Sequence, residues 1–184
     1  MPSIKTSPEE IVKKSILVFR ENGYYRTTMN DLANATGLTK GAFYHHFKNK
    51  EEVMRMSLKA TSMWFEKKIF SIAYNEELTN KEKLVTMGDI LFTAFTKNKG
   101  GCFFANTILE TAYVEDTFIK EIDTFFSLFE KALENIFTEK YKNEKLKNVV
   151  VQVISEIEGT IILMQLKKNP TLLRNTLNRV VELI

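Results

Sequence analysis

Three observations predict an all-α protein of about nine helices. Long segments run without a helix breaker, since the 184 residues include only three prolines and seven glycines. Apolar residues recur at spacings of three and four along most of these segments, which is typical of amphipathic helices. No secure strand pattern occurs: residues 149–154 have a strand-like composition, but the apolar residues continue to Leu166 and favour a buried helix.

Three helices are expected within residues 1–50. The first begins where the N-cap serine Ser7 precedes Pro8 and two acidic residues, which suit the positive end of a helix dipole, and it ends at Gly23. The second follows the N-cap residue Thr28 and runs to about Thr36. The third follows the N-cap residue Thr39 and covers residues 40–46.

The second and third of these helices form a helix-turn-helix pattern. Gly37 lies where the chain must turn sharply, because glycine adopts left-handed dihedrals without a Cβ clash. A connection of three or four residues that includes glycine is typical of this motif. Small Ala33 allows the helices to approach closely, and their apolar side is expected to comprise Leu32, Leu38, Phe43 and Phe47.

The positive charge of the chain is concentrated in its N-terminal quarter. Residues 1–50 hold eight Lys or Arg and four acidic residues, whereas the rest of the chain holds 18 and 19. The net charge of +3 therefore belongs to the segment with the helix-turn-helix pattern. A basic segment around such a motif favours contact with DNA phosphates.

Residues 11–53 resemble the DNA-binding domain of TetR-family transcriptional repressors. The resemblance rests on Ile11–Tyr24, on Thr27–Met29, on Ala33–Leu38 and on the run Lys-Gly-Ala-Phe-Tyr-His-His-Phe at residues 40–47, followed by Lys-Asn-Lys-Glu at 48–51. It implies a helix-turn-helix DNA-binding domain at residues 1–50 and a helical effector-binding and dimerisation domain at residues 51–184. It also implies a repressor that a small effector releases from its operator.

The DNA contacts are expected at the N-terminal end of the third helix, since that part of a recognition helix faces base edges. Lysine can donate to guanine or to phosphate, glycine lets the backbone approach closely, and the other polar groups can donate hydrogen bonds. The expected contact residues are Thr28, Thr39, Lys40, Gly41, Ala42, Tyr44, His45, His46 and Lys50. For Tyr44 and His46 the alternative is packing against the protein's own helices, and for Lys50 it is an ordinary solvated side chain.

Beyond residue 50 the pattern predicts six further helices, at about residues 51–74, 81–98, 102–113, 115–140, 146–167 and 171–183, with a break at Lys99–Gly101. Their aromatic and methionine residues are expected to be mostly core. The resemblance nevertheless implies an effector pocket among them, for an apolar or aromatic ligand. Its candidate residues are Trp64, Phe92, Phe95, Phe103, Phe104, Asn106, Glu110, Phe125, Phe129 and Met164.

The last two predicted helices favour a two-fold homodimer. The helix at 146–167 is apolar around nearly its whole circumference, and Gly159 and Thr160 allow another helix to approach closely. The last helix carries a similar apolar stripe, which comprises Leu172, Leu173, Leu177, Val180, Val181 and Ile184. The resemblance implies that both helices pair with their symmetry mates, so the operator should be near-palindromic. The alternative is that both helices close a monomeric core.

The single cysteine, Cys102, excludes an internal disulfide and suits a reducing cytoplasm. It lies at an expected helix N-terminus, where the dipole favours a reactive thiolate, so thiol modification is an alternative signal to effector binding. A small buried apolar role is the simpler interpretation.

Other functional classes are less well supported. The sequence shows no metal-spaced His/Cys cluster, no phosphate-binding glycine loop and no paired-carboxylate motif, so we expect no metal, no cofactor and no enzyme activity. No uninterrupted apolar run reaches the roughly 20 residues that span a bilayer, so no membrane partner is expected. An effector-free DNA-binding protein remains an alternative. The sequence does not reveal the effector or the operator, nor whether the effector releases the protein from DNA or promotes its binding.

Overall fold

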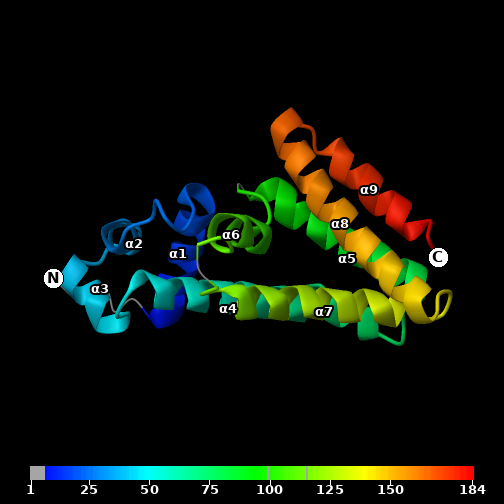
Figure 1. Ribbon diagram of the computed structural model, residues 1–184, viewed down its shortest axis with the longest axis horizontal. Helices are drawn as coiled ribbons and strands as arrows, with labels where there is room; N and C mark the ends of the chain where they lie inside the picture. The colour runs from blue at the N-terminus through cyan, green and yellow to red at the C-terminus, as the bar shows by residue number, and fades with distance from the viewer. Residues whose placement is uncertain (1–6, 99, 115) are drawn as a thin grey trace. The chain divides into compact units, whose positions relative to one another are not determined.

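The fold is described from a computed structural model for residues 7–98, 100–114 and 116–184. Within these ranges the chain forms nine α-helices, one 3-10 segment and no strand, which confirms the all-α prediction (Figure 1). The elements are α1 (Pro8–Asn22), α2 (Met29–Thr36), α3 (Lys40–His46), α4 (Lys50–Lys68), η1 (Phe70–Tyr74), α5 (Asn80–Lys97), α6 (Phe103–Thr111), α7 (Ile119–Phe137), α8 (Asn143–Lys167) and α9 (Thr171–Val181).

The chain divides into two compact units. Unit 1 comprises the residues up to Ser62 together with Phe103–Ile122, and unit 2 comprises Met63–Cys102 together with Asp123–Ile184. Unit 1 therefore holds α1 to α3, most of α4 and the whole of α6. Helix α6, which is distant from α1 in the sequence, folds with the N-terminal helices.

Local capping explains the short helices of unit 1. The Ser7 side chain accepts a hydrogen bond from the Glu10 N–H at 3.3 Å, and Gly23 ends α1 with φ 78°. The predicted starts at Thr28 and Thr39 and the predicted end at Thr36 are confirmed. The core of this unit consists of fully buried apolar side chains, among them Ile11, Leu32, Phe43, Val53 and Leu58.

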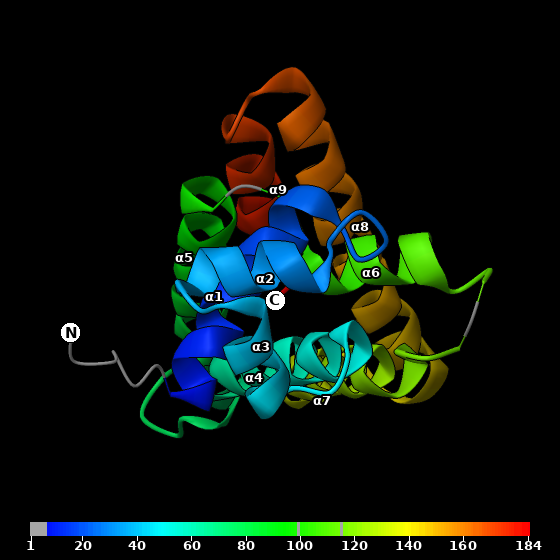
Figure 2. The same ribbon diagram turned by 90° about the vertical axis from the view of Figure 1, so that its left-hand side faces the viewer.

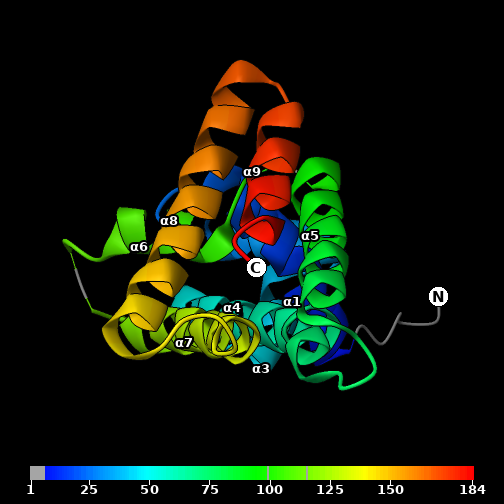
Figure 3. The ribbon, with the colours of Figure 1, turned by 90° about the vertical axis from the view of Figure 1, so that its right-hand side faces the viewer.

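Unit 2 is built around α5, α8 and α9, which lie side by side in Figure 3. Helix α9 packs on both α5 and α8. Leu173, Leu177 and Val180 of α9 are buried within the single chain. At these three residues the last helix therefore contributes to the protomer's own core. This was the alternative to a dimer contact there.

An aromatic cluster accounts for an incorrect helix prediction. The helix expected at residues 51–74 ends at Lys68, because Ile69 leaves the helical region with φ −124° and a 3-10 segment follows. This change of direction places the Phe70 ring in a stack on Phe129, with centroids 5.1 Å apart, and beside Phe65 and Phe125. Burial of Phe70 and Ala73 outweighs continuation of a regular helix.

Other helix ends also differ from the predictions. Helix α7 begins at Ile119 rather than at Glu115, a residue outside those described, and α8 begins at Asn143 within a predicted loop. Asn143 has φ 49°, a conformation that asparagine tolerates better than most residues. The break after α5 is confirmed at Gly100 and Gly101, with φ 91° and 64°, whereas Lys99 lies outside the described residues.

Candidate DNA-binding site

Helices α2 and α3 form a tightly held helix-turn-helix (Figure 2). Gly37 has φ 76° in the left-handed region and donates from its N–H to Ala33 and Asn34 carbonyl oxygens. The Leu38 N–H donates to the Ala33 carbonyl oxygen at 3.0 Å, which closes the turn. The buried Thr36 hydroxyl is within hydrogen-bond distance of the Leu32 and Ala33 carbonyl oxygens, at 3.1 and 2.8 Å.

The capping residues of these helices are among the expected DNA contacts. Thr28 forms a capping box with Asp31, whose Oδ2 accepts from the Thr28 N–H at 2.9 Å and from its hydroxyl at 2.7 Å. The Thr28 hydroxyl, followed by its N–H, lowers the pKa of Asp31. Thr39 accepts from the Ala42 N–H at 3.2 Å, an arrangement in which a hydroxyl retains its own proton for a second partner.

Helix α3 presents its predicted contact residues outward. Tyr44 is 45% exposed, so it is not packed into unit 1, and Phe43 beside it is fully buried. A Cβ added at Gly41 would meet no atom within 4 Å, so the helix surface is open there. The predicted contact residues on α2, α3 and their N-caps lie at the surface. Ala42 is half-buried. The exposed residues are Thr28, Thr39, Lys40, Gly41, Tyr44, His45 and His46.

Lys50 differs from the other predicted contacts because its charged end is held by the protein. The half-buried Lys50 donates from Nζ to the Tyr24 carbonyl oxygen at 2.7 Å. The same nitrogen lies 4.2 Å from the centroid of the Tyr24 ring, a cation–π distance. Any contact with phosphate would compete with these interactions, and it stays a prediction.

The candidate effector residues are divided between the two units. Phe103, Asn106 and Glu110 line a groove of about 360 Å³ in unit 1, together with the C-terminal end of α1 and residues Gly23, Tyr24 and Arg26. In unit 2, Phe125 and Phe129 are buried in the aromatic cluster, whereas Trp64 is 44% exposed. Four others remain: buried Phe95, Phe104 and Met164, and Phe92, whose ring lies 4.1 Å from the Arg174 guanidinium carbon.

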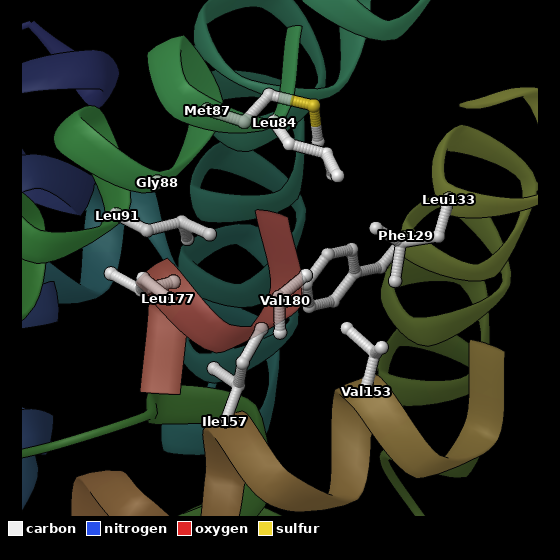
Figure 4. A pocket seen from close by; sticks show the side chains of 10 residues that line it. All are labelled: Leu84, Met87, Gly88, Leu91, Phe129, Leu133, Val153, Ile157, Leu177 and Val180. Atoms are coloured by element: carbon white, nitrogen blue, oxygen red, sulfur yellow. The ribbon is translucent and has the colours of Figure 1, made fainter. Parts of the chain in front are cut away.

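Unit 2 also contains a small cavity, of about 20 Å³ (Figure 4). Its lining is apolar, and Phe129 is the one candidate effector residue in it; the full set is Leu84, Met87, Gly88, Leu91, Phe129, Leu133, Val153, Ile157, Leu177 and Val180. This space holds about one water molecule, whereas small-molecule sites measure about 300–1,000 Å³. The sequence did not reveal the other lining residues, because leucine and valine on a helix face look the same in a core and in a cavity.

Cys102 is buried, so it lacks the exposure typical of reactive thiols. It makes a side-chain hydrogen bond with half-buried Glu158 of α8. Burial raises the pKa of Glu158 to about 6, against a smaller lowering by the Cys102 hydrogen bond. Within the described residues, no group of three or more His, Cys, Asp or Glu gathers as a metal site would require.

Comparison with known proteins identifies the class to which this geometry belongs. Residues 11–55 match the family described as bacterial regulatory proteins, tetR family. Residues 84–179, just over half of the chain, match the C-terminal domain of LmrA/YxaF-like transcriptional regulators. The chain belongs to the TetR family of bacterial transcriptional regulators.

Relatives of this TetR-family chain are regulators of the same kind. An uncharacterised HTH-type transcriptional regulator from the lacX 3′ region of Lactococcus lactis is 23% identical over 178 residues, covering 94% of this chain and 90% of that protein. The probable acrEF/envCD operon repressor of Escherichia coli K12 is 32% identical over 71 residues, 39% of this chain and 30% of that protein. The protein is therefore a DNA-binding transcriptional regulator and not an enzyme.

Solved structures of TetR-family regulators share the fold. One from Legionella pneumophila superposes with a TM-score of 0.88 at 21% identity, with 99% of each chain covered. FadR from Bacillus subtilis, solved with stearoyl-CoA, has a TM-score of 0.74 at 19% identity, covering 97% of this chain and all of that one. These similarities establish the fold, and the ligand belongs to that neighbour alone.

Proposed function

We propose that this regulator is a repressor that binds a near-palindromic operator as a homodimer and is released by a small apolar or aromatic effector. The observation that carries the proposal is the exposed face of α3, where Lys40, Tyr44 and His45 lie outward beside the open backbone of Gly41. Such a face can enter the major groove without displacing any buried side chain. We place its site of action in the cytoplasm, where a bacterial operator lies.

The polar groups on this face are assigned by their chemistry. Lys40 reaches a guanine edge or a phosphate, and the Tyr44 hydroxyl reaches a phosphate. His45 and His46 donate hydrogen bonds to the DNA. The N-terminal ends of α2 and α3, capped by Thr28 and Thr39, direct their first N–H groups toward flanking phosphates.

Helix α8 provides the surface for the proposed dimer. Its residues Val151, Ser155, Gly159, Ile162 and Leu166 are exposed and recur at spacings of three and four. Ile162 is 57% and Leu166 is 76% exposed, an apolar stripe that a second copy would cover. A Cβ at Gly159 would meet nothing within 4 Å, so a partner helix can approach closely there. Exposed parts of α9 would extend this interface.

A membrane is the competing occupant of that stripe. By length and mean hydropathy α8 could cross a bilayer, although it has no uninterrupted apolar run of about 20 residues, and 28% of its most apolar window is buried. Membership in a family of DNA-binding regulators favours the second copy, since operator symmetry then mirrors protein symmetry.

The proposed effector would occupy unit 2, where an apolar cavity already lies between α5, α7, α8 and α9. Enlarging this cavity to the size of a ligand requires these helices to move apart, which couples effector binding to protein conformation. The FadR neighbour was solved with stearoyl-CoA, a ligand whose acyl chain is long and apolar. Thiol modification at Cys102 is the alternative signal, and burial of the thiol argues against it. The other alternative is an effector-free regulator.

The proposal is tested by replacing the exposed groups of α3. Lys40→Ala and Tyr44→Ala should each weaken operator binding at least 10-fold with unchanged helix content, because the side chains face outward. Duplexes would be selected from a random pool with the wild-type protein, and affinity measured by fluorescence anisotropy near physiological salt. Lys13→Ala, which removes an exposed charge from α1, is the matched control and should have a smaller effect. Unchanged affinity in both α3 variants would contradict the assignment.

A further inference from the structure

Charged side chains from two helices hold the turn between α1 and α2. The Glu110 carboxylate of α6 accepts hydrogen bonds from two backbone N–H groups of this turn. The Tyr24 N–H donates to Oε2 and the Tyr25 N–H donates to Oε1, each at 2.8 Å. Lys50, the first residue of α4, donates from Nζ to the Tyr24 carbonyl oxygen at 2.7 Å. Hydrogen bonds to charged groups are stronger than neutral ones, so the turn is held firmly from both sides.

A single peptide group lies between these two charges. The amide that joins Tyr24 to Tyr25 has its N–H on the Glu110 carboxylate and its C=O on the Lys50 ammonium. The dipole of this amide is therefore aligned with the field of both charges, and each interaction strengthens the other. Removal of either charge weakens the restraint from the opposite side as well.

The absence of a side chain at Gly23 leaves room for the Glu110 carboxylate. Gly23 has φ 78°, and a Cβ there would lie 2.8 Å from Oε2 and 3.0 Å from Oε1 of Glu110. Thr27 is bonded to the same turn. Its hydroxyl donates to the Gly23 carbonyl oxygen at 2.6 Å, and its N–H donates to the Tyr24 carbonyl oxygen at 3.3 Å. The next residue is Thr28, the N-cap of α2. The hydrogen bonds from α6 therefore fix the backbone of the turn that leads into the helix-turn-helix.

The geometry points to Glu110 as a positioning residue for operator binding, because its carboxylate holds the turn that leads into α2. While its carboxylate remains on Tyr24 and Tyr25, the helix-turn-helix is oriented for DNA. Without the carboxylate the turn is looser, and DNA binding must then order it again, which lowers affinity. This inference rests on the proposed DNA-binding function and assigns Glu110 to the positioning of the helix-turn-helix.

The test is Glu110→Gln, assayed on duplexes that the wild-type protein selects. Loss of a negative charge alone should tighten binding to polyanionic DNA, whereas loss of the clamp should weaken it at least 10-fold. The two explanations therefore predict opposite signs. Glu66→Gln, which removes the same charge from an exposed position of α4, is the control and should bind as tightly as wild type or slightly more tightly. Circular dichroism at the assay temperature verifies that each variant is folded.

Amide hydrogen exchange gives a local readout that a general loss of stability would not produce. In Glu110→Gln the Tyr24 and Tyr25 amides should exchange at least 10-fold faster, with the α2 and α3 amides unchanged. Should Glu110→Gln fail to fold, Lys50→Gln tests the opposite side of the same peptide and should also accelerate exchange at Tyr25. In the double variant the combined acceleration of exchange at Tyr25 should be smaller than the product of the two single effects, because both act on one amide.

The outcomes separate this inference from the function on which it rests. If the wild-type protein enriches no duplex, the proposed function fails and the role of Glu110 fails with it. If the wild type binds DNA and Glu110→Gln binds equally well or more tightly, only the positioning role is overturned. Unchanged exchange at Tyr24 and Tyr25 would also overturn it.

Discussion

At the scale of single residues, carboxylates in this protein act on nearby groups of their own chain. Asp31 completes a capping box, Glu110 accepts two turn amides and Glu121 pairs with Arg55 at 2.9 Å. From the sequence, Glu110 was expected among the effector contacts because it is a polar residue within a mostly apolar helix. The sequence showed the polar residue in its apolar helix. It did not show that the partner of Glu110 is Tyr24, 86 residues away along the chain.

Glu158 gives a pH-dependent prediction. Its pKa rises from 4.5 to about 6 on folding, so its stabilising contribution is present below pH 4.5 and is lost as the pH rises through 6. Glu158→Gln keeps an acceptor for the Cys102 thiol but carries no charge. It should be more stable than wild type by about 1 kcal/mol at pH 8, after allowance for solvent screening, and nearly equal to it at pH 4.5. Urea unfolding at both pH values and one protein concentration measures the difference. An equal difference at both would contradict the prediction.

At the scale of elements, capping decides where α1, α2, α3 and α5 begin, and packing decides where some other helices end. Ser7, Thr28, Thr39 and Thr79 each accept a hydrogen bond from an N–H in the first turn that follows, and all four starts were predictable from local chemistry. The end of α4 was not, because it depends on Phe70 reaching the aromatic cluster with Phe125 and Phe129.

Two glycines of the helix-turn-helix should respond differently to alanine. Neither meets an atom within 4 Å of its added Cβ, but Gly37 is left-handed and Gly41 is helical. Gly37→Ala should destabilise the protein by about 1 kcal/mol, and Gly41→Ala should stabilise it by about 0.5 kcal/mol. If the α3 backbone approaches DNA at residue 41, Gly41→Ala should nevertheless bind the operator about 10-fold more weakly. Thermal unfolding and anisotropy titration measure the two effects. Tighter or equal binding by Gly41→Ala would place that backbone away from the DNA.

At the scale of the whole molecule, the exposed apolar surface of α8 is the feature on which the proposed dimer rests. Leu173, Leu177 and Val180 of α9 complete the protomer core, whereas Ile162 and Leu166 of α8 remain exposed. A solitary protomer would keep these apolar side chains in water, and a symmetric pair would remove them from it.

A charge placed in that surface should dissociate the protein. Ile162→Glu would bury an unpaired carboxylate in the proposed interface, so sedimentation at micromolar concentration, without detergent, should show a dimer for wild type and a monomer for the variant. Operator affinity should fall at least 100-fold, because both half-sites are no longer bound together. Val85→Glu, at an exposed apolar position on α5, should remain dimeric. A wild-type monomer would argue against this mode of repression.

The sequence by itself determined the helical class, the caps and the helix-turn-helix, because these depend on side chains within a few residues of one another. It also indicated the family, since residues 40–51 carry a long and specific pattern that the comparison then matched within residues 11–55. Only the tertiary structure decided that Lys50 and Glu110 hold one peptide, that Cys102 is buried, and that the core of unit 2 leaves about 20 Å³ of space. These features join residues far apart in the chain, and their partners are selected by packing and charge in three dimensions, which local periodicity does not record.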